Sequence, residues 1–344
     1  MIRKYFFKQM ASWRMGHYFY GTSTRCCKVL HTEFIAPEMS IDGRKNDYTI
    51  LFLHGLLGSG RNLKTFAKKL VKQSHGSCRG GWLMDLRGHG KSYQSQKEDD
   101  ENDNITHREP PTFRDCAQDI YDTMEDIQKK QRTPPTTQVV VGHSFGGRLA
   151  LEYAANIAEN NSVKAVWLLD TVPGQANESV DKVLTTITRV LEDRNKNNTD
   201  LNKENLTKKD MIKVLTDPPH SLDRTTAQWL AMSYDEKSGD NFGYDTQMVD
   251  CIKPEFASQD FMGLLRKILR SNNQFDTTKA EDANNTIHVH VVRGGLNTGW
   301  TIPILSELER LKKEYPATFH LHVLPKANHN LHIDDLNGLL KLFS

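Results

Sequence analysis

The pentapeptide Gly142-His143-Ser144-Phe145-Gly146 places a serine between two glycines, each two positions away. This Gly-x-Ser-x-Gly pattern follows a run of β-branched residues, Gln138–Val141, and precedes an alanine-rich stretch, Arg148–Ala158. A strand before and a helix after form the context in which such a serine occupies a strained turn and exposes its hydroxyl at a sheet edge. Side chains in place of the two glycines would collide with the neighbouring strand and helix. Ser144 is therefore a candidate nucleophile for attack on a carbonyl carbon.

Backbone N–H groups beside Ser144 could stabilise the oxyanion that such an attack creates. The helix after Ser144 would point its N-terminus at the reacting oxygen, so the N–H of Phe145 is one candidate donor. The second candidate lies in the turn His54-Gly55-Leu56-Leu57-Gly58, which follows the first clear strand. We assign the second donor to Leu56, with Leu57 as the alternative.

The general base should be a histidine late in the chain, because proteins with this serine motif order their partners Ser, Asp or Glu, His. His329 lies in a loop that follows the predicted strand Thr318–Leu324. A loop at the carboxyl end of a parallel strand faces the same sheet edge as Ser144. We favour His329 over His332, which begins the last predicted helix. Other histidines alternate with apolar residues in strands and should line one sheet face without binding a metal: His288, His290, His320 and His322.

The acidic partner is harder to place. The usual position follows the strand Thr286–Val292, but the segment there, Arg293–Gly299, contains no carboxylate. Asp170 instead stands at the carboxyl end of the preceding sheet strand, from which it could reach the imidazole and fix its tautomer. Asp245 is the rival candidate.

The elements that must position these residues alternate between strand and helix. Short apolar runs predict buried strands, and segments with helical apolar spacing lie between them. This alternation predicts a mostly parallel sheet with helices on both faces. The expected strands are Tyr48–Leu53, Gly81–Asp85, Gln138–Val141, Val163–Leu169, Thr286–Val292 and Thr318–Leu324, and the expected helices include Asn62–Gln73, Asp115–Gln128, Arg148–Ala158, Ile302–Glu314 and Leu336–Phe343.

Two segments interrupt the alternation. Residues 94–111 are acidic and nearly free of large apolar side chains, which predicts a solvated loop insertion. Residues 174–280 are rich in helical patterns and lie between two sheet strands, which predicts a helical cap inserted into the core domain. The helices expected in this cap are Val180–Leu191, Lys208–Leu215, Ala227–Tyr234 and Phe256–Leu269.

The first residues have a different composition. Residues 1–32 contain basic and hydroxyl side chains but no Asp or Glu, and the first acidic residue is Glu33. This composition is typical of an organellar transit peptide. We expect residues 1–30 to be a mitochondrial targeting leader, with another organelle or the cytoplasm as the alternative, and residues 31–344 to form the hydrolase domain.

Composition excludes several function classes. The 344 residues contain 45 Lys and Arg against 43 Asp and Glu, so no basic excess favours a nucleic-acid partner. No run of eighteen apolar residues occurs, so we expect no transmembrane helix. The five cysteines include no Cys-x-x-Cys pair, which excludes a zinc ribbon and a thioredoxin motif. We expect neither a metal nor an organic cofactor.

Several motifs together resemble the α/β-hydrolase superfamily, and within it the group around α/β-hydrolase domain-containing protein 11 with its plant, algal and small bacterial esterase relatives. The motifs are HGLLGS (54–59), DLRGHGKS (85–92), GHSFGG (142–147), WLLDTVPG (167–174) and HVLPKANHNLHIDD (322–335). The resemblance implies an α/β-hydrolase fold, and it supports Asp170 because bacterial esterases of this group carry their acid after the corresponding strand. One departure is Asn328-His329-Asn330, where family members commonly have Gly-His-Trp.

The sequence thus predicts a serine hydrolase that cleaves a small-molecule carboxylic ester or thioester through an acyl-enzyme on Ser144, with His329 as base and Asp170 as its partner. Two other readings stay open. One is an acyltransferase, or a lipase acting on glycerolipids, with the same three residues. The other is a non-catalytic binding protein that keeps the fold.

Overall fold

The computed structural model describes residues 29–37, 48–74, 78–95, 110–131, 137–158, 162–174, 178–196, 206–236, 242–272 and 286–344. Residues 1–28 of the expected targeting leader (1–30) and most of the acidic insertion at 94–111 lie outside the described residues, whereas Leu30 is buried in the core.

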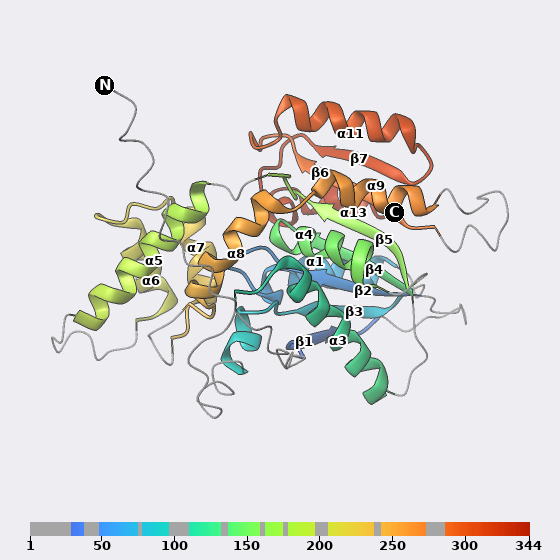
Figure 1. Cartoon of the computed structure of the whole chain (residues 1–344). Helices are drawn as coiled ribbons and strands as arrows, with labels where there is room; N and C mark the ends of the chain where they lie inside the picture. The colour runs from blue at the N-terminus through green and yellow to red at the C-terminus, as the bar shows by residue number, and fades with distance from the viewer. Residues whose placement is uncertain are drawn as a thin grey trace, which may run out of the picture.

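One sheet forms the centre of the described structure (Figure 1). Its seven strands follow the order β1-β3-β2-β4-β5-β6-β7. β1 runs antiparallel to β3, and every other neighbouring pair is parallel, so the sheet is mostly parallel as predicted. The strands are β1 (Thr32–Ile35), β2 (Tyr48–Leu53), β3 (Cys78–Met84), β4 (Thr137–His143), β5 (Val163–Leu169), β6 (His288–Gly294) and β7 (Phe319–Leu324).

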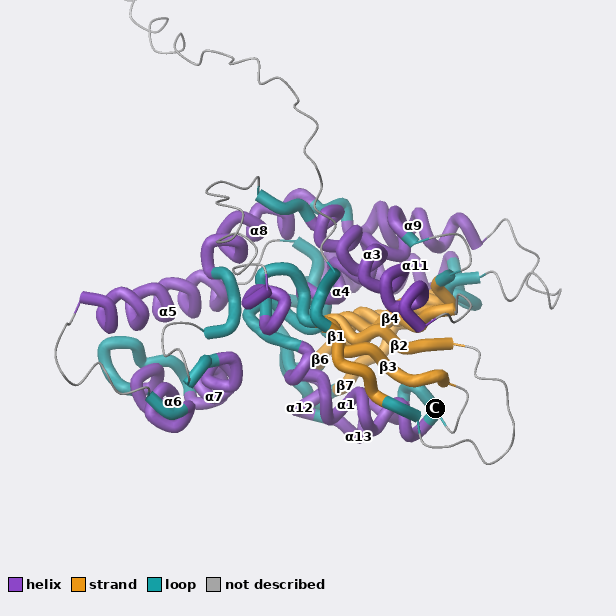
Figure 2. The backbone as a smooth tube through the Cα atoms, turned by 90° about the horizontal axis from the view of Figure 1, so that it is seen from below, coloured by secondary structure: helices purple, strands orange, loops and turns teal. Residues whose placement is uncertain are grey.

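The strands are apolar on both faces because helices cover both sides of the sheet. In β2, Leu51 and Leu53 belong to one buried cluster, whereas Ile50 and Phe52 belong to the other. α1 (Gly60–Gln73), α12 (Leu331–Asp334) and α13 (Leu336–Lys341) lie on the second face. α3 (Phe113–Gln131), α4 (Phe145–Glu152), α9 (Phe261–Asn272) and α11 (Ile302–Glu314) lie on the first, and Figure 2 shows the two layers on opposite sides of the strands.

The helix after Ser144 differs from the prediction. It was expected over Arg148–Ala158, but α4 begins at Phe145 and is followed by a π-helical turn over Tyr153–Ile157. The early start matters for chemistry, because it places the first free N–H groups of the helix directly after Ser144.

The expected cap segment, 174–280, holds five helices in its described part. α5 (Glu178–Lys196), α6 (Lys208–Thr216) and α7 (Arg224–Ser233) project beyond one end of the sheet, and α8 (Thr246–Ser258) connects them to the core (Figure 1). α9 packs against α4 and the π turn, so it covers the sheet as a core helix. The prediction of a single helix over Phe256–Leu269 was wrong, because α8 ends at Ser258 and α9 begins at Phe261. Between them, the Asp260 carboxylate accepts the N–H of Gly263.

Among the described helices, none is both long and apolar enough to span a membrane.

Candidate active site

Ser144 occupies a strained turn between β4 and α4. Its backbone angles are φ 52° and ψ −113°, a left-handed conformation that is unfavourable for a residue with a side chain. The two flanking glycines explain how the turn is possible. A Cβ at Gly142 would meet the carbonyl of Gly146, and a Cβ at Gly146 would meet the carbonyl of Leu53. Glycine is therefore required at both positions, as the sequence pattern predicts.

Backbone hydrogen bonds hold this turn in place. The N–H of Ser144 donates to the carbonyl of Leu169, the last residue of β5, at 3.0 Å. The N–H groups of Gly147 and Arg148 donate to the carbonyl of Ser144 at 3.0 and 3.2 Å. The Ser144 side chain, which is partly exposed, thus sits on a backbone that both the sheet and the helix fix.

Asp170 and His329 meet at the carboxyl edge of the sheet. The Nδ1–H of His329 donates to Oδ2 of Asp170 at 2.8 Å. Asp170 is fully buried directly after β5, whereas the His329 side chain, in the loop after β7, is 46 % exposed. With its proton on Nδ1, the imidazole presents the lone pair of Nε2, which is the form a general base needs.

The last residue of β6 and the loop after it contribute three further hydrogen bonds to Asp170. The N–H of Gly294 and the indole N–H of Trp300 donate to Oδ1 at 2.8 and 2.7 Å, and the Asn297 amide donates to Oδ2. These donors satisfy a carboxylate that would otherwise be buried without partners. The segment Arg293–Gly299 stood out in the sequence only for its lack of a carboxylate. The Asn297 amide and the Trp300 indole, both possible donors, were missed.

The structure places the rival candidates elsewhere. Asp245 caps the N-terminus of α8, where its carboxylate accepts the N–H of Met248 at 2.9 Å. His332 lies in α12 with its ring 5.1 Å from the ring of His143. Burial lowers the pKa of His332 to about 4, with a smaller contribution from His329. Of the candidate pairs, Asp170 and His329 are the two that the fold brings into contact.

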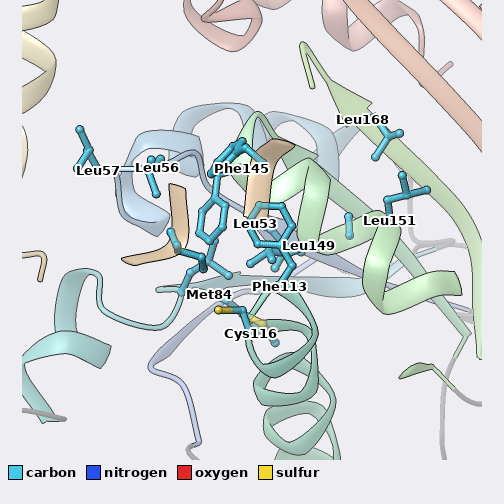
Figure 3. Packing of buried hydrophobic residues seen from close by; sticks show 14 of the residues in the cluster. Leu53, Leu56, Leu57, Met84, Phe113, Cys116, Phe145, Leu149, Leu151 and Leu168 are labelled. Carbon is cyan, nitrogen blue, oxygen red and sulfur yellow. The ribbon is translucent and has the colours of Figure 1, made fainter. Parts of the chain in front are cut away.

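Two backbone N–H groups remain candidates for oxyanion binding. Phe145 is the first residue of α4, and the first N–H groups of a helix have no intrahelical partner. Its side chain is buried with Leu53, Phe113 and Leu149 (Figure 3). The alternative donor Leu57 is excluded, because its N–H donates to Nε2 of His89 at 3.1 Å.

The loop that carries Leu56 lies directly against Ser144. A Cβ built on Gly55 would be 3.5 Å from the Cβ of Ser144 and 2.8 Å from Nδ1 of His143. The side chain of His143 reaches in the other direction and donates from Nε2 to the carbonyl of His329 at 2.9 Å. Burial lowers the pKa of His143 well below its ordinary value, so this neutral imidazole links the turn of Ser144 to the loop of His329.

Two buried histidines, His54 and His89, form hydrogen bonds between the loop after β2 and the loop after β3. His54 accepts the N–H of Leu86 at 2.9 Å, and the two rings of His54 and His89 lie 5.2 Å apart. Burial lowers the pKa of His54 to about 4 and that of His89 to about 3. Both are therefore neutral hydrogen-bonding groups that hold the turn of Leu56 and Leu57 beside Ser144.

The four strand histidines line one sheet face, as predicted. Nδ1 of His290 is 3.1 Å from Nε2 of His322, and the His290 ring stacks on Trp167 at 3.8 Å. Within the described ranges, no group of three or more His, Cys, Asp or Glu side chains has the geometry to hold a metal ion.

Comparison with known proteins agrees with this architecture. The family model described as alpha/beta hydrolase fold matches residues 48–208. The chain therefore has the α/β-hydrolase fold. Among solved structures, it is similar to a marine microorganism esterase (18 % identity, TM-score 0.60, covering 91 % of this chain and 97 % of the other). It is also similar to E-2-(acetamidomethylene)succinate hydrolase (18 % identity, TM-score 0.55, 90 % and 97 %). At these identities the likeness concerns the fold.

Two curated relatives match part of this α/β-hydrolase-fold chain. One is the sn-1-specific diacylglycerol lipase ABHD11 of Danio rerio, 27 % identical over 132 residues, which are 38 % of this chain and 34 % of the relative. The other is a probable alcohol acetyltransferase of Wickerhamomyces anomalus, 26 % identical over 124 residues, 36 % of this chain and 29 % of the relative. The match thus spans about a third of the length of each relative or less.

Proposed function

We propose that this protein is a serine hydrolase that cleaves a carboxylic ester or thioester through an acyl-enzyme on Ser144. The observation that carries the proposal is the 2.8 Å hydrogen bond between Asp170 and His329 at the sheet edge where Ser144 occupies its strained turn. A nucleophile, a base and a group that orients the base are the three parts that this chemistry requires.

In the proposed reaction, Oγ of Ser144 attacks the carbonyl carbon while Nε2 of His329 takes the serine proton. The N–H groups of Leu56 and Phe145 bind the oxyanion of the tetrahedral intermediate. Collapse of this intermediate expels the alcohol or thiol, which receives the proton from His329, and leaves the acyl group on Ser144. Asp170 stabilises the imidazolium that forms in each half of the reaction. Water, activated by His329, then releases the acid and restores the serine.

A second activity would use the same residues. In an acyltransferase, an alcohol replaces water in the second half of the reaction, and in a glycerolipid lipase the leaving group is a glyceride. The two relatives are named as a diacylglycerol lipase and a probable alcohol acetyltransferase, so both activities belong in the test. A non-catalytic binding protein is the remaining alternative.

Turnover of a substrate panel tests the proposal. p-Nitrophenyl esters and acyl thioesters of increasing chain length, together with a diacylglycerol, would be offered to the full chain, with and without a small alcohol as acceptor. We expect release of free acid from at least one ester or thioester. Acyl transfer to the alcohol in preference to water would support the acyltransferase. No product from any substrate by folded protein would support the binding protein.

We also propose that the protein is delivered to mitochondria. The support is the acid-free, basic and hydroxylated composition of residues 1–32. Residues 1–32 fused to a fluorescent protein should direct it to mitochondria, and a fusion in which the basic residues are replaced by glutamine should not. A diffuse signal from the unaltered fusion would contradict the proposal.

A further inference from the structure

Arg148 is a charged residue in the interior of the protein. It lies in the first turn of α4, four residues after Ser144, and is 1 % exposed. Its guanidinium donates to four oxygens: the carbonyls of Val172 and Gly174 at 2.5 and 2.7 Å, and the carbonyl of Phe256 and Oε1 of Gln259 at 3.2 Å each. The guanidinium carbon also lies 5.4 Å from the ring centroid of Phe256 and 5.3 Å from that of Phe261.

This arrangement is unusual because no acid of the described ranges compensates the charge. Among the residues that the structure describes, no carboxylate lies within ion-pair distance of Arg148. Burial alone lowers its pKa, to about 10. A buried charge is costly to desolvate and is normally paired with an opposite charge. A structural link between separate segments would explain why an arginine is kept here, since a planar guanidinium with five donors can hold several carbonyls at once.

The segments that Arg148 joins all bear on the candidate active site. Val172 and Gly174 lie two and four residues after Asp170, so their carbonyls lie on the loop that carries the acid. Between them and Asp170, Thr171 packs against Gly147, where a Cβ would collide with the threonine hydroxyl. On the other side, Phe256 and Gln259 lie where α8 ends before α9. One guanidinium thus fixes the acid loop to the helix that begins at the nucleophile.

We propose that Arg148 is a positioning residue: it holds the loop 170–174 against α4 and thereby sets Asp170 at hydrogen-bonding distance from His329. The catalytic part of this inference rests on the proposed function. Without the arginine, the 172–174 carbonyls lose their donors, the loop relaxes and the carboxylate no longer fixes the tautomer of His329. Displacement of a reacting group by about 1 Å can reduce turnover roughly 100-fold.

The direct test is the tautomer of His329, read from the nitrogen-15 shifts of its imidazole at mildly alkaline pH. A His329→Gln variant assigns the signals. Wild type should show the Nδ1–H tautomer, and Arg148→Met should show a mixture with the Nε2–H tautomer. In the same variant we expect kcat on a p-nitrophenyl ester to fall about 10- to 100-fold, with KM changed less than threefold. Arg148→Lys, which supplies a point charge that cannot span the carbonyls, should recover only part of kcat.

Two control variants separate positioning from general stability. Gln259→Leu removes the α8–α9 side-chain partner of Arg148 but leaves the contacts to Val172 and Gly174, so the tautomer should stay as in wild type. Lys253→Met removes an ion pair between α8 and Asp181 of α5 and should leave both the tautomer and kcat unchanged within about twofold.

Gly174→Ala provides a second route if Arg148→Met fails to fold. Gly174 has φ +97°, a conformation that alanine rarely adopts, so the substitution should move the carbonyl that Arg148 binds. It should shift the His329 tautomer in the same direction as Arg148→Met. If folded Arg148→Met keeps the wild-type tautomer of His329, the positioning role is overturned. If Arg148→Met does not fold, an unchanged tautomer in Gly174→Ala overturns it instead. If wild type has the Nδ1–H tautomer but turns over no substrate, the proposed function fails, while the tautomer alone still decides the role of Arg148.

Discussion

Oδ2 of Asp170 lies 2.8 Å from Nδ1 of His329, although 159 positions separate the two residues in the chain. The parallel order β4-β5-β6-β7 explains this contact, because it brings the ends of β5 and β7 to the same edge of the sheet as Ser144. The loop after β6, which lies between them, carries no acid of its own and supplies the Asn297 and Trp300 donors to Asp170.

Replacing Asp170 by asparagine should abolish most of the turnover. An amide would donate to Nδ1 and favour the wrong imidazole tautomer, an effect that lowers kcat by roughly 10⁴-fold in a serine triad. The matched control is Asp245→Asn, because asparagine caps a helix as well as aspartate does. Steady-state kinetics of both variants check the assignment. Equal loss of kcat in both, or a loss confined to Asp245→Asn, would refute it.

Trp300→Phe should remove one hydrogen bond to Asp170 while keeping an aromatic side chain at this position. The change removes one N–H donor to a buried carboxylate, which costs about 1.5–3 kcal/mol in unfolding free energy. We expect kcat to fall about tenfold, because the carboxylate keeps its remaining donors. Trp82→Phe, at a tryptophan of β3 whose ring lies 4.6 Å from the ring of Phe34 and is tilted by 45° to it, is the control for lost aromatic packing. Urea unfolding and kcat would be measured for both, and an equal kcat in the two variants would contradict the account.

Gly142→Ala should damage the nucleophile turn itself. The new Cβ would meet the backbone carbonyl of Gly146, which cannot rotate away as a side chain can. We expect a loss of about 1–3 kcal/mol in stability together with a large loss of kcat. Wild-type kcat in Gly142→Ala would show that the turn is not built as described.

Stability should fall in mild acid because of the buried histidines. The pKa of His54 is lowered from 6.5 to about 4, so between these values the unfolded chain binds a proton that the folded chain does not. The unfolding free energy therefore rises with pH across this window. The contribution of His54 to stability is lost as pH falls from 6.5 towards 4. In urea unfolding at several pH values, His54→Gln should show a shallower decline than wild type. The control is His220→Gln, at a partly exposed histidine, whose unfolding free energy should fall with pH as steeply as that of wild type. An equally steep fall in His54→Gln would refute the assignment to His54.

The strands and the core helices could largely be predicted from the sequence. Tyr48–Leu53, Val163–Leu169 and Ile302–Glu314 match β2, β5 and α11 because long apolar runs or clear helical spacing define them. β1 was missed because four residues, Thr-Glu-Phe-Ile, give too short a pattern; its pairing with β3 stabilises it instead.

The candidate site could be predicted only in part from the sequence. Ser144, Asp170 and His329 could be singled out because each follows a recognisable strand. The exclusion of Leu57 depends on a hydrogen bond to His89, and the role of Asn297 depends on which loop lies between β5 and β7. Both are contacts between segments distant in the chain, and no local pattern encodes them.

The most direct test of the central claim is covalent labelling by a fluorophosphonate, located by mass spectrometry. This reagent phosphonylates an activated serine whatever the natural substrate is. The account predicts rapid modification of Ser144 in wild type, slow modification in His329→Gln, and none at this site in Ser144→Ala. Folded wild-type protein that stays unlabelled, or a label on another residue that persists in Ser144→Ala, would contradict the claim that Ser144 is the nucleophile.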